Sequence, residues 1–347
     1  MKSLRLIIPD LFLPKDFAAE VSVDLRLPAL TKLLARGSTT PGKILGNLEN
    51  LLGELFCQSG ANDAPIAAIS AVYDGLPQGN WLRADPVNLR LQRDQLLLSS
   101  VLPSVDEAQQ FCSSLNEYFA GQGMAFFAPH PQRWYVRLDE PPNIRTTPLP
   151  ELFGCNVRRD LPTGEDAAHW HKLFNEIQML LYAHSVNDAR EVRGEPTINS
   201  VWLWGEGKME EPLRKDYQSV SSDDELVKMF SSAADIPFLA WDKQWNDSPT
   251  LTLPQGERGY FEGNQLLVWT GLRAAIQQGD LAAWRDALQA FEIGYVQPLW
   301  QAMQSGKISQ IKIDVLAGDN SRSFNVMRSA AWNVWRRSKP LAQFSLV

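Results

Sequence analysis

The sequence of 347 residues predicts an α/β protein, with a mostly parallel sheet covered by helices on both faces and an inserted small α+β domain. Two observations predict this class. Several short runs are apolar on both sides of the strand alternation, as buried parallel strands are. Amphipathic helical segments separate these runs, which is the order of elements that a parallel sheet requires. We expect the core to comprise 1–79 and 186–347, and the insert to comprise 80–185.

The expected strands of the core are five apolar runs, at Leu4–Ile8, Pro65–Tyr73, Ser200–Trp204, Ile236–Trp241 and Ile308–Leu316. The first core helix is expected to follow Pro28, because proline suits a first helical turn, and Gly37 stands where a C-terminal cap belongs. A later helix is expected from Asp280, with apolar residues at helical spacing as far as Tyr295.

The insert has a different pattern. Ranges 84–91 and 95–101 flank a turn-like Gln-Arg-Asp and predict a hairpin, although a proline makes the first of them an edge or late-starting strand. Ser104 and Glu107 form a capping box at the start of a helix. Two more strands are expected at 124–128 and 133–138, before a helix that follows Thr163 with Asp166 near its start. Two strands, a helix, two strands and a helix predict one sheet with helices on one face.

Composition excludes several classes of function. A hydrophobic content of 44% is enough for a sizeable core, and 33 basic against 40 acidic residues give a net charge of −7. That balance argues against a general nucleic-acid binder, which carries a basic face. No run approaches the roughly 18 apolar residues of a membrane span. The first apolar run ends at Pro9 and Asp10, so we expect no signal peptide and no membrane partner.

The three cysteines are Cys57, Cys112 and Cys155, and no two of them form a CxxC pair. An odd number of widely separated cysteines predicts neither a disulfide framework nor a zinc motif. We therefore expect a protein of the reducing cytoplasm, with cysteines that are inert buried thiols.

The most distinctive segment runs from His184 to Lys208 and reads HSVNDAREVRGEPTINSVWLWGEGK. It resembles a segment of archaeal-type cofactor-independent phosphoglycerate mutases, and is more similar still to the bacterial family known as the regulatory protein RpfE. Further similar stretches occur in the same order, at 84–94, 129–135 and 175–181. The resemblance implies an alkaline-phosphatase-like core with an inserted small domain, and two metal ions beside a Ser or Thr nucleophile.

The residues that this implied metal site needs are largely missing from the sequence. Two-metal phosphoryl transfer requires carboxylates, imidazoles and a nucleophile held between the cations. Asp10 follows the first strand, as the family's first ligand would, but no histidine follows His184. Range 317–320 lacks the Asp-His pair expected after its strand, and range 46–53, where the nucleophile is expected, has no Ser or Thr. We therefore expect a non-catalytic regulatory or scaffold protein without a metal cofactor.

Such a protein is expected to bind a phosphorylated metabolite through polar groups of the distinctive segment, namely Asn187, Arg190, Arg193, Asn199, Gly205, Gly207 and Lys208. The turn at 205–208 follows a strand, so its N–H groups and the lysine ammonium could hold an anion. The alternative is a simple tight turn. Similarly, Arg190 and Arg193 could pair with nearby Glu191 instead of a ligand.

Two rival functions remain open. The first is an active phosphatase or mutase with a carboxylate-only Mg²⁺ or Mn²⁺ site, because oxygen ligands suit these hard cations. Its candidate ligands are Asp10, Asp242, Asp314 and Asp319. The second is a protein-interaction module at the aromatic C-terminus, where Trp332 and Trp335 stand beside Arg336 and Arg337. These tryptophans are expected either on the docked face of a terminal helix or in an exposed aromatic-basic patch for a protein partner.

The remaining histidines and tryptophans allow ordinary structural interpretations. His169 and His171 diverge on a helix, so we expect them at its surface rather than on a shared metal. His184 is expected to contact the last carbonyls of the helix that it ends. Trp202 and Trp204 share one face of a strand and are expected in the core or in a cleft wall.

Overall fold

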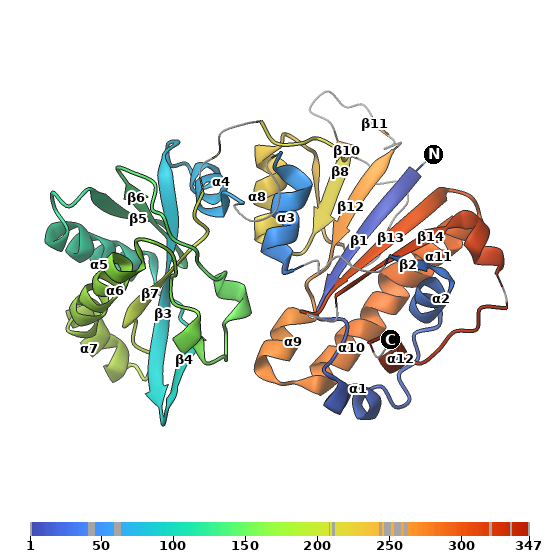
Figure 1. Ribbon diagram of the computed structural model, residues 1–347, viewed down its shortest axis with the longest axis horizontal. Coiled ribbons are helices and arrows are strands. Elements are labelled where there is room, and N and C mark those ends of the chain that lie inside the picture. Colours follow the sequence, from blue (N-terminus) through green and yellow to red (C-terminus); the bar gives the residue numbers. More distant parts are fainter. Residues whose placement is uncertain are drawn as a thin grey trace. The chain divides into compact units, whose positions relative to one another are not determined.

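The computed structural model describes residues 2–40, 46–58, 64–207, 209, 212–242, 245, 251–252, 258–259, 263–318, 321–333 and 335–345 (Figure 1). The chain divides into two compact units: unit 1 comprises 1–56 and 213–347, and unit 2 comprises 57–212. The insert therefore starts earlier and ends later than the predicted range 80–185.

Unit 1 contains a seven-stranded sheet in the order β2-β14-β13-β1-β12-β8-β9. The strands are β1 (Lys2–Pro9), β2 (Ser38–Thr40), β8 (Ser219–Ser222), β9 (Phe238–Ala240), β12 (Asn264–Val268), β13 (Ile308–Leu316) and β14 (Arg322–Met327). The five strands from β13 to β9 are parallel, and β14 and β2 add antiparallel strands at one edge. The predicted α/β class, with a largely parallel central sheet, is confirmed. A separate short pair is formed by β10 (Leu251–Thr252) and β11 (Arg258–Gly259).

The α-helices of unit 1 are α1 (Lys15–Val21), α2 (Pro28–Arg36), α3 (Leu48–Phe56), α8 (Glu225–Ala233), α9 (Arg273–Gln278), α10 (Leu281–Phe291), α11 (Gln297–Gln304) and α12 (Ala342–Ser345). A π-helical turn, η4 (Glu292–Val296), joins α10 to α11, and η5 (Arg328–Trp332) is a 3₁₀ turn. The predicted starts of α2 and α10 are confirmed, and the Asp280 side chain accepts the N–H of Ala283 at 2.9 Å. Gly37 is the C-cap of α2, as predicted.

The main core of unit 1 lies between its sheet and α2, α10 and α11. Buried Leu6 of β1, Leu30 of α2 and Trp284 of α10 belong to one apolar cluster. Helix α8 packs against β8 and also contacts α3, where the rings of Phe56 and Phe230 lie 5.5 Å apart. Figure 1 shows α3 and α8 side by side, next to β8.

Unit 2 is built on an antiparallel sheet in the order β4-β3-β6-β5, with β7 also paired to β3. Its strands are β3 (Asn80–Gln92), β4 (Gln95–Ser100), β5 (Met124–His130), β6 (Arg133–Leu138) and β7 (Ser200–Trp204). Its helices are α4 (Ile66–Tyr73), α5 (Val105–Tyr118), α6 (Ala167–Tyr182) and α7 (Ser185–Val192), with the 3₁₀ turns η2 (Leu149–Glu151) and η3 (Val157–Arg159). The predicted hairpins at 84–101 and 124–138 and the capping box of Ser104 and Glu107 are confirmed.

Helices cover both faces of this second sheet. On one face, α5 and α6 enclose a core that includes Leu82 and Trp134. On the other face, the alanines of α4 pack against Trp81 and Tyr135. Helices on both faces differ from the single covered face that the sequence predicts for the insert. The Asp166 side chain accepts the N–H of Asn143 and does not cap α6.

Two strand predictions for the core were wrong. Range 65–73 is helix α4, because a short run of alanine and isoleucine has no periodicity that separates a strand from a buried helix. Strand β7 was expected in the parallel core, but it pairs antiparallel with β3. The Ala67 N–H also donates to the carbonyl of Gly205 at 2.8 Å. These pairings place 57–79 and 186–212 in unit 2.

The C-terminal tryptophans are exposed rather than docked on the core. Trp332 ends η5 with 64% of its surface exposed, and Trp335 is 74% exposed. The expected terminal helix with a docked aromatic face is therefore wrong for these residues. Cys155 is likewise exposed, whereas Cys57 and Cys112 are buried as predicted. None of the helices in the described part of the chain has the length and apolar character that a membrane crossing needs.

Candidate functional site

The two asparagines of the distinctive segment hold its own backbone in place. Asn187 is buried; its amide donates to the carbonyls of Leu181 and Ile198, and its oxygen accepts the N–H of Ile198. Asn199 exchanges a similar pair of bonds with the backbone of Leu89 at the edge of β3. Both amides are therefore used by the fold of unit 2.

The two arginines of the segment have anionic partners within unit 2, but not the Glu191 that the sequence analysis considered. Arg190 is 1% exposed and lies 2.7 Å from Glu107, while Arg193 lies 2.6 Å from the other oxygen of Glu107 and 2.8 Å from Glu195. Burial on its own would raise the pKa of Glu107. The Ser104 N–H and the two guanidinium groups outweigh burial and hold this pKa below its usual range. Both cations therefore contribute to a structural ion-pair network.

The glycines of the segment shape a turn against α4. Gly205 has φ +74°, its carbonyl accepts the N–H of Ala67, and its own N–H donates to Thr146. Gly207 has φ +135°, and a Cβ placed there would lie 2.8 Å from Cα of Pro65. Only glycine fits both the backbone conformation and this close approach. Lys208, the predicted anion-binding ammonium, lies outside the described residues.

Sequence reasoning missed a buried polar network beside this turn. Trp204 is buried as predicted, and its indole N–H donates to Asp85 at 2.8 Å. Arg83 binds the same carboxylate through two nitrogens: Nε donates to Oδ1 at 3.0 Å and Nη2 donates to Oδ2 at 2.7 Å. Asp85 lies on the same face of β3 as Arg83, two residues earlier, and both side chains are buried. Only the pairing of β3 with β7 brings Trp204 next to it.

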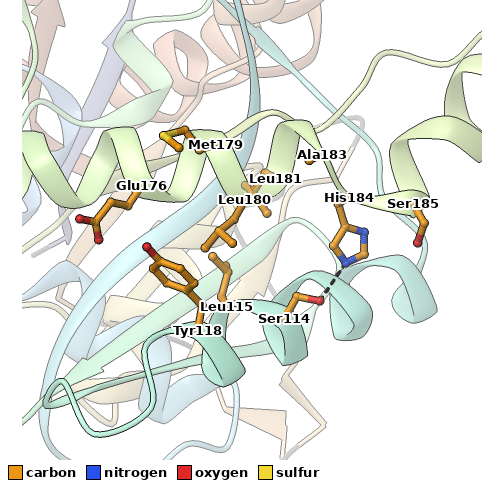
Figure 2. A pocket seen from close by; sticks show the side chains of 10 residues that line it. All are labelled: Ser114, Leu115, Tyr118, Glu176, Met179, Leu180, Leu181, Ala183, His184 and Ser185. Atoms are coloured by element: carbon orange, nitrogen blue, oxygen red, sulfur yellow. Dashed lines mark hydrogen bonds between the residues drawn. The ribbon is translucent and has the colours of Figure 1, made fainter.

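A cavity of about 570 Å³ opens between α5 and α6 in unit 2 (Figure 2). Its lining combines apolar side chains with a few polar ones, from Ser114, Leu115, Tyr118, Glu176, Met179, Leu180, Leu181, Ala183, His184 and Ser185. Ser114 and His184 form a hydrogen bond of 3.0 Å at one end. Nδ1 of His184 accepts the N–H of Val186, so His184 caps the start of α7 rather than the end of α6. Because Nδ1 accepts this bond, the proton of the neutral ring lies on Nε2, which donates to Ser114 and cannot act as its base.

Three of the four candidate metal ligands of the sequence analysis lie in the described residues of unit 1. Asp314 is fully buried in β13, where Arg5 binds its carboxylate at 2.6 Å and Ser323 donates to its other oxygen. Asp242 is exposed, and Asp319 lies outside the described residues. The remaining candidate, Asp10, follows β1 at the carboxyl edge of the sheet. Among the described residues, no group of three or more His, Cys, Asp or Glu has a metal-binding arrangement. His169 and His171 are both exposed on α6, as predicted.

Charged side chains nevertheless gather at the carboxyl edge of the parallel sheet in unit 1. Asp10 follows β1 with φ +60°, a strained conformation for a residue with a side chain. Asp224 follows β8 and caps α8, while Arg273 begins α9 just after β12. Glu49 lies in the first turn of α3 and is 1% exposed. This edge is where open α/β sheets place their ligand sites.

Arg273 is the cation within this acidic group. Its Nη1 lies 3.5 Å from Oε1 of Glu49 and 3.9 Å from Oδ2 of Asp224. Oε2 of Glu49 is buried and has no hydrogen-bond partner among the described residues. Burial raises the pKa of Glu49 and of Asp10 above the usual range, and in both cases Arg273 opposes the rise. We define Asp10, Glu49, Asp224 and Arg273 as the edge cluster.

Comparison with known proteins supports a relation to phosphoglycerate mutases. The 2,3-bisphosphoglycerate-independent phosphoglycerate mutase of Methanosarcina mazei is 25% identical over 200 residues, covering 52% of this chain and 48% of that protein. A second mutase, from Methanothermobacter thermautotrophicus, is 36% identical over 66 residues, or 19% of this chain and 16% of that one. The chain thus aligns with about half the length, or less, of these curated relatives. No protein-family model matches the sequence.

Two solved structures are similar over nearly the whole chain. The PH0037 protein of Pyrococcus horikoshii has a TM-score of 0.52 with 11% identity, covering 94% of this chain and 87% of that one. A cofactor-independent phosphoglycerate mutase from Thermoplasma acidophilum has a TM-score of 0.45 with 13% identity, covering 94% and 89%. The sequence matches show similarity to phosphoglycerate mutases over about half of the chain or less, and the PH0037 match supports the fold class.

A two-metal centre of the kind implied by this relation does not fit the described residues. The edge cluster offers carboxylates, but a guanidinium stands between two of them. Range 46–53, where the nucleophile was expected, contains Asn47, Leu48 and the buried Glu49. A carboxylate cannot supply the alkoxide that a Ser or Thr nucleophile forms. No imidazole lies in the described part of unit 1, since all four histidines belong to unit 2.

Proposed function

We propose that this chain is a non-catalytic, phosphoglycerate-mutase-like regulatory or scaffold protein of the RpfE type, which acts by binding instead of phosphoryl transfer. One observation carries the proposal: among the described residues, no group of three or more His, Cys, Asp or Glu has an arrangement that could hold a metal ion. Asp314 is held by Arg5 and Ser323 inside the sheet, and Asp242 is exposed. Two-metal chemistry needs such groups to converge on the cations.

Two exposed tryptophans in the C-terminal segment 328–339 support a protein partner. Trp332 and Trp335 present large aromatic surface, and the segment contains four basic and no acidic residues, namely Arg328, Arg336, Arg337 and Lys339. Exposed aromatic side chains beside arginine are typical of protein interfaces. The proposed partner is a protein of the cytoplasm.

Binding of a phosphorylated metabolite is a separate part of the proposal. It is supported by the mutase relatives, whose names specify phosphoglycerate as the compound they act on. In the structure the predicted contacts Arg190, Arg193, Asn187 and Asn199 are bonded to protein groups. A thermal shift with 3-phosphoglycerate tests this part, because a ligand that binds only the folded state raises its apparent stability.

The main test measures bound metal and mutase activity on the same sample. The full chain is incubated with Mn²⁺ and Zn²⁺, desalted and analysed for metal, then assayed for phosphoglycerate mutase and phosphatase turnover. We expect neither stoichiometric metal nor turnover. Stoichiometric metal that is lost in Asp10→Ala, together with turnover, would instead establish the rival enzyme with an altered Mg²⁺ or Mn²⁺ site.

A further inference from the structure

We propose that the cavity between α5 and α6 of unit 2 is a binding site for a small amphipathic amine of the arylalkylamine class, whose ammonium group pairs with Glu176. The proposed function assigns a protein partner to segment 328–339 and an anionic metabolite to the distinctive segment. This inference goes beyond it by adding a separate site for a ligand of opposite charge.

The first support is the size and the apolar character of the cavity. Its volume of about 570 Å³ falls within the range of sites for small organic ligands. Leu115 and Leu181 contribute buried walls that belong to the core of unit 2. At the rim, Tyr118 is 48% exposed and Met179 is 73% exposed. Exposed apolar side chains that border a cavity are typical of ligand-binding sites.

The second support is the charge of the lining. Among the described residues that line the cavity, Glu176 is the one with a charged side chain at neutral pH. Burial lowers the pKa of His184, which keeps that imidazole neutral. The carboxylate of Glu176 lies 3.7 Å from Lys172, but Lys172 is 79% exposed and a surface pair of this kind contributes little stability. An ammonium group of a ligand can therefore replace Lys172, whereas Glu176 would repel a phosphate or a carboxylate.

The third support is the separation of the polar groups along the cavity. Figure 2 shows Glu176 and Tyr118 at one end, Ser114 and His184 at the other, and apolar side chains between them. Ser114 and Tyr118 are four residues apart in α5, which corresponds to about 6 Å along the helix axis. The Ser114 hydroxyl accepts the bond from His184, and its own O–H can donate to an acceptor in the cavity.

These positions define the chemistry of the ligand. Its ammonium group lies at Glu176, its apolar body fills the middle of the cavity, and a hydrogen-bond acceptor reaches Ser114. An aromatic body suits the middle, because the ring of Tyr118 can pack against it and the thioether of Met179 interacts favourably with aromatic rings. Tyramine has these three parts, with its phenol oxygen as the acceptor, and serves as the probe.

The experiment measures the binding of three probes to the full chain by NMR titration. The probes are tyramine, neutral 4-ethylphenol and anionic 3-(4-hydroxyphenyl)propionate, which share the phenol ring and differ in charge. We expect tyramine to bind about fivefold more tightly than 4-ethylphenol, because a partly exposed ion pair contributes a factor of this order. The propionate should bind most weakly of the three.

Three variants locate the site. Glu176→Gln should reduce the affinity for tyramine to that for 4-ethylphenol, and should leave the affinity for 4-ethylphenol unchanged. Glu191→Gln is the matched control, because it removes the same charge from an exposed position of unit 2 outside the cavity, and should keep the preference for tyramine. Ala183→Trp fills the cavity from an exposed position and should abolish binding of all three probes.

Several results would overturn this inference. Tyramine that does not bind, or that binds no more tightly than the other two probes, contradicts the charge argument. A preference for tyramine that survives Glu176→Gln, or is lost equally in Glu191→Gln, shows a general attraction to an acidic chain. Binding that survives Ala183→Trp places the site elsewhere. These results are independent of the metal and activity measurements that test the proposed function.

Discussion

Replacement of Arg190 distinguishes a structural role of the distinctive segment from a ligand-binding role. In the structure the guanidinium is 1% exposed, bonds Glu107 at 2.7 Å and donates to the carbonyl of Pro196 at 2.8 Å. Breaking a buried ion pair by removing one partner costs about 3–5 kcal/mol. Arg193 still contacts Glu107 in the variant, so we expect Arg190→Met to cost about 3 kcal/mol, the lower end of that range.

The assay is calorimetric or urea unfolding of the full chain, following the transition that contains unit 2. For a unit of roughly 150–250 residues, this loss corresponds to a fall in Tm of about 6–12 °C. Lys172→Met is the matched control, because Lys172 is exposed and its pair with Glu176 spans 3.7 Å at the surface. An Arg190→Met chain with wild-type stability would refute the structural reading of this network and restore Arg190 as a candidate ligand contact.

Three further predictions concern unit 2. Burial lowers the pKa of His184, so the unfolded chain takes up the proton at a higher pH than the folded chain. The free energy of unfolding should therefore fall as the pH drops below about 6.5. His184→Asn, which can still cap α7, should flatten that slope in urea titrations at pH 5–7. Gly207→Ala should lower the free energy of unfolding by about 2 kcal/mol or more, because its Cβ would meet Pro65. Gly194→Ala should lower it by less, because a Cβ there meets open space. Burial raises the pKa of the Cys112 thiol to about 12, so this thiol should not react in the native chain. Mass spectrometry should therefore find maleimide on exposed Cys155 in the native chain, and on Cys112 only after denaturation.

Local patterns predicted most elements because their signals lie within a few residues. The capping box at Ser104 and Glu107 fixes the start of α5, and the hairpin of β3 and β4 is visible as two runs around a turn. The failure at 65–73 has the same origin. Eight residues of mostly alanine, isoleucine and valine fit a buried strand or a buried helix equally well, and only the contacts of α4 with Trp81 and Tyr135 decide.

The unit boundaries depend on pairing at long range. Strand β7 looks like any buried parallel strand in the sequence, yet its partner is β3, more than a hundred residues away. The same separation hides the partner of Arg190: the sequence analysis considered neighbouring Glu191, whereas the structure supplies Glu107 from α5. Charge patterns along the chain identify pairs at helical spacing but not pairs that form only through tertiary packing.

The edge cluster could not be predicted because each of its residues is ordinary in its local context. Glu49 is one acidic residue in a first helical turn, Asp224 is one N-cap, and Arg273 opens a short helix. The sequence showed which residues of the resembled family's metal site are missing, and a missing ligand carries no information about what stands in its place. Once the parallel strands bring their ends together, the accumulated negative charge requires compensation, and the buried Glu49 makes that requirement strict. Arg273 supplies a positive charge within 4 Å of Glu49 and Asp224, and only the assembled sheet brings it there.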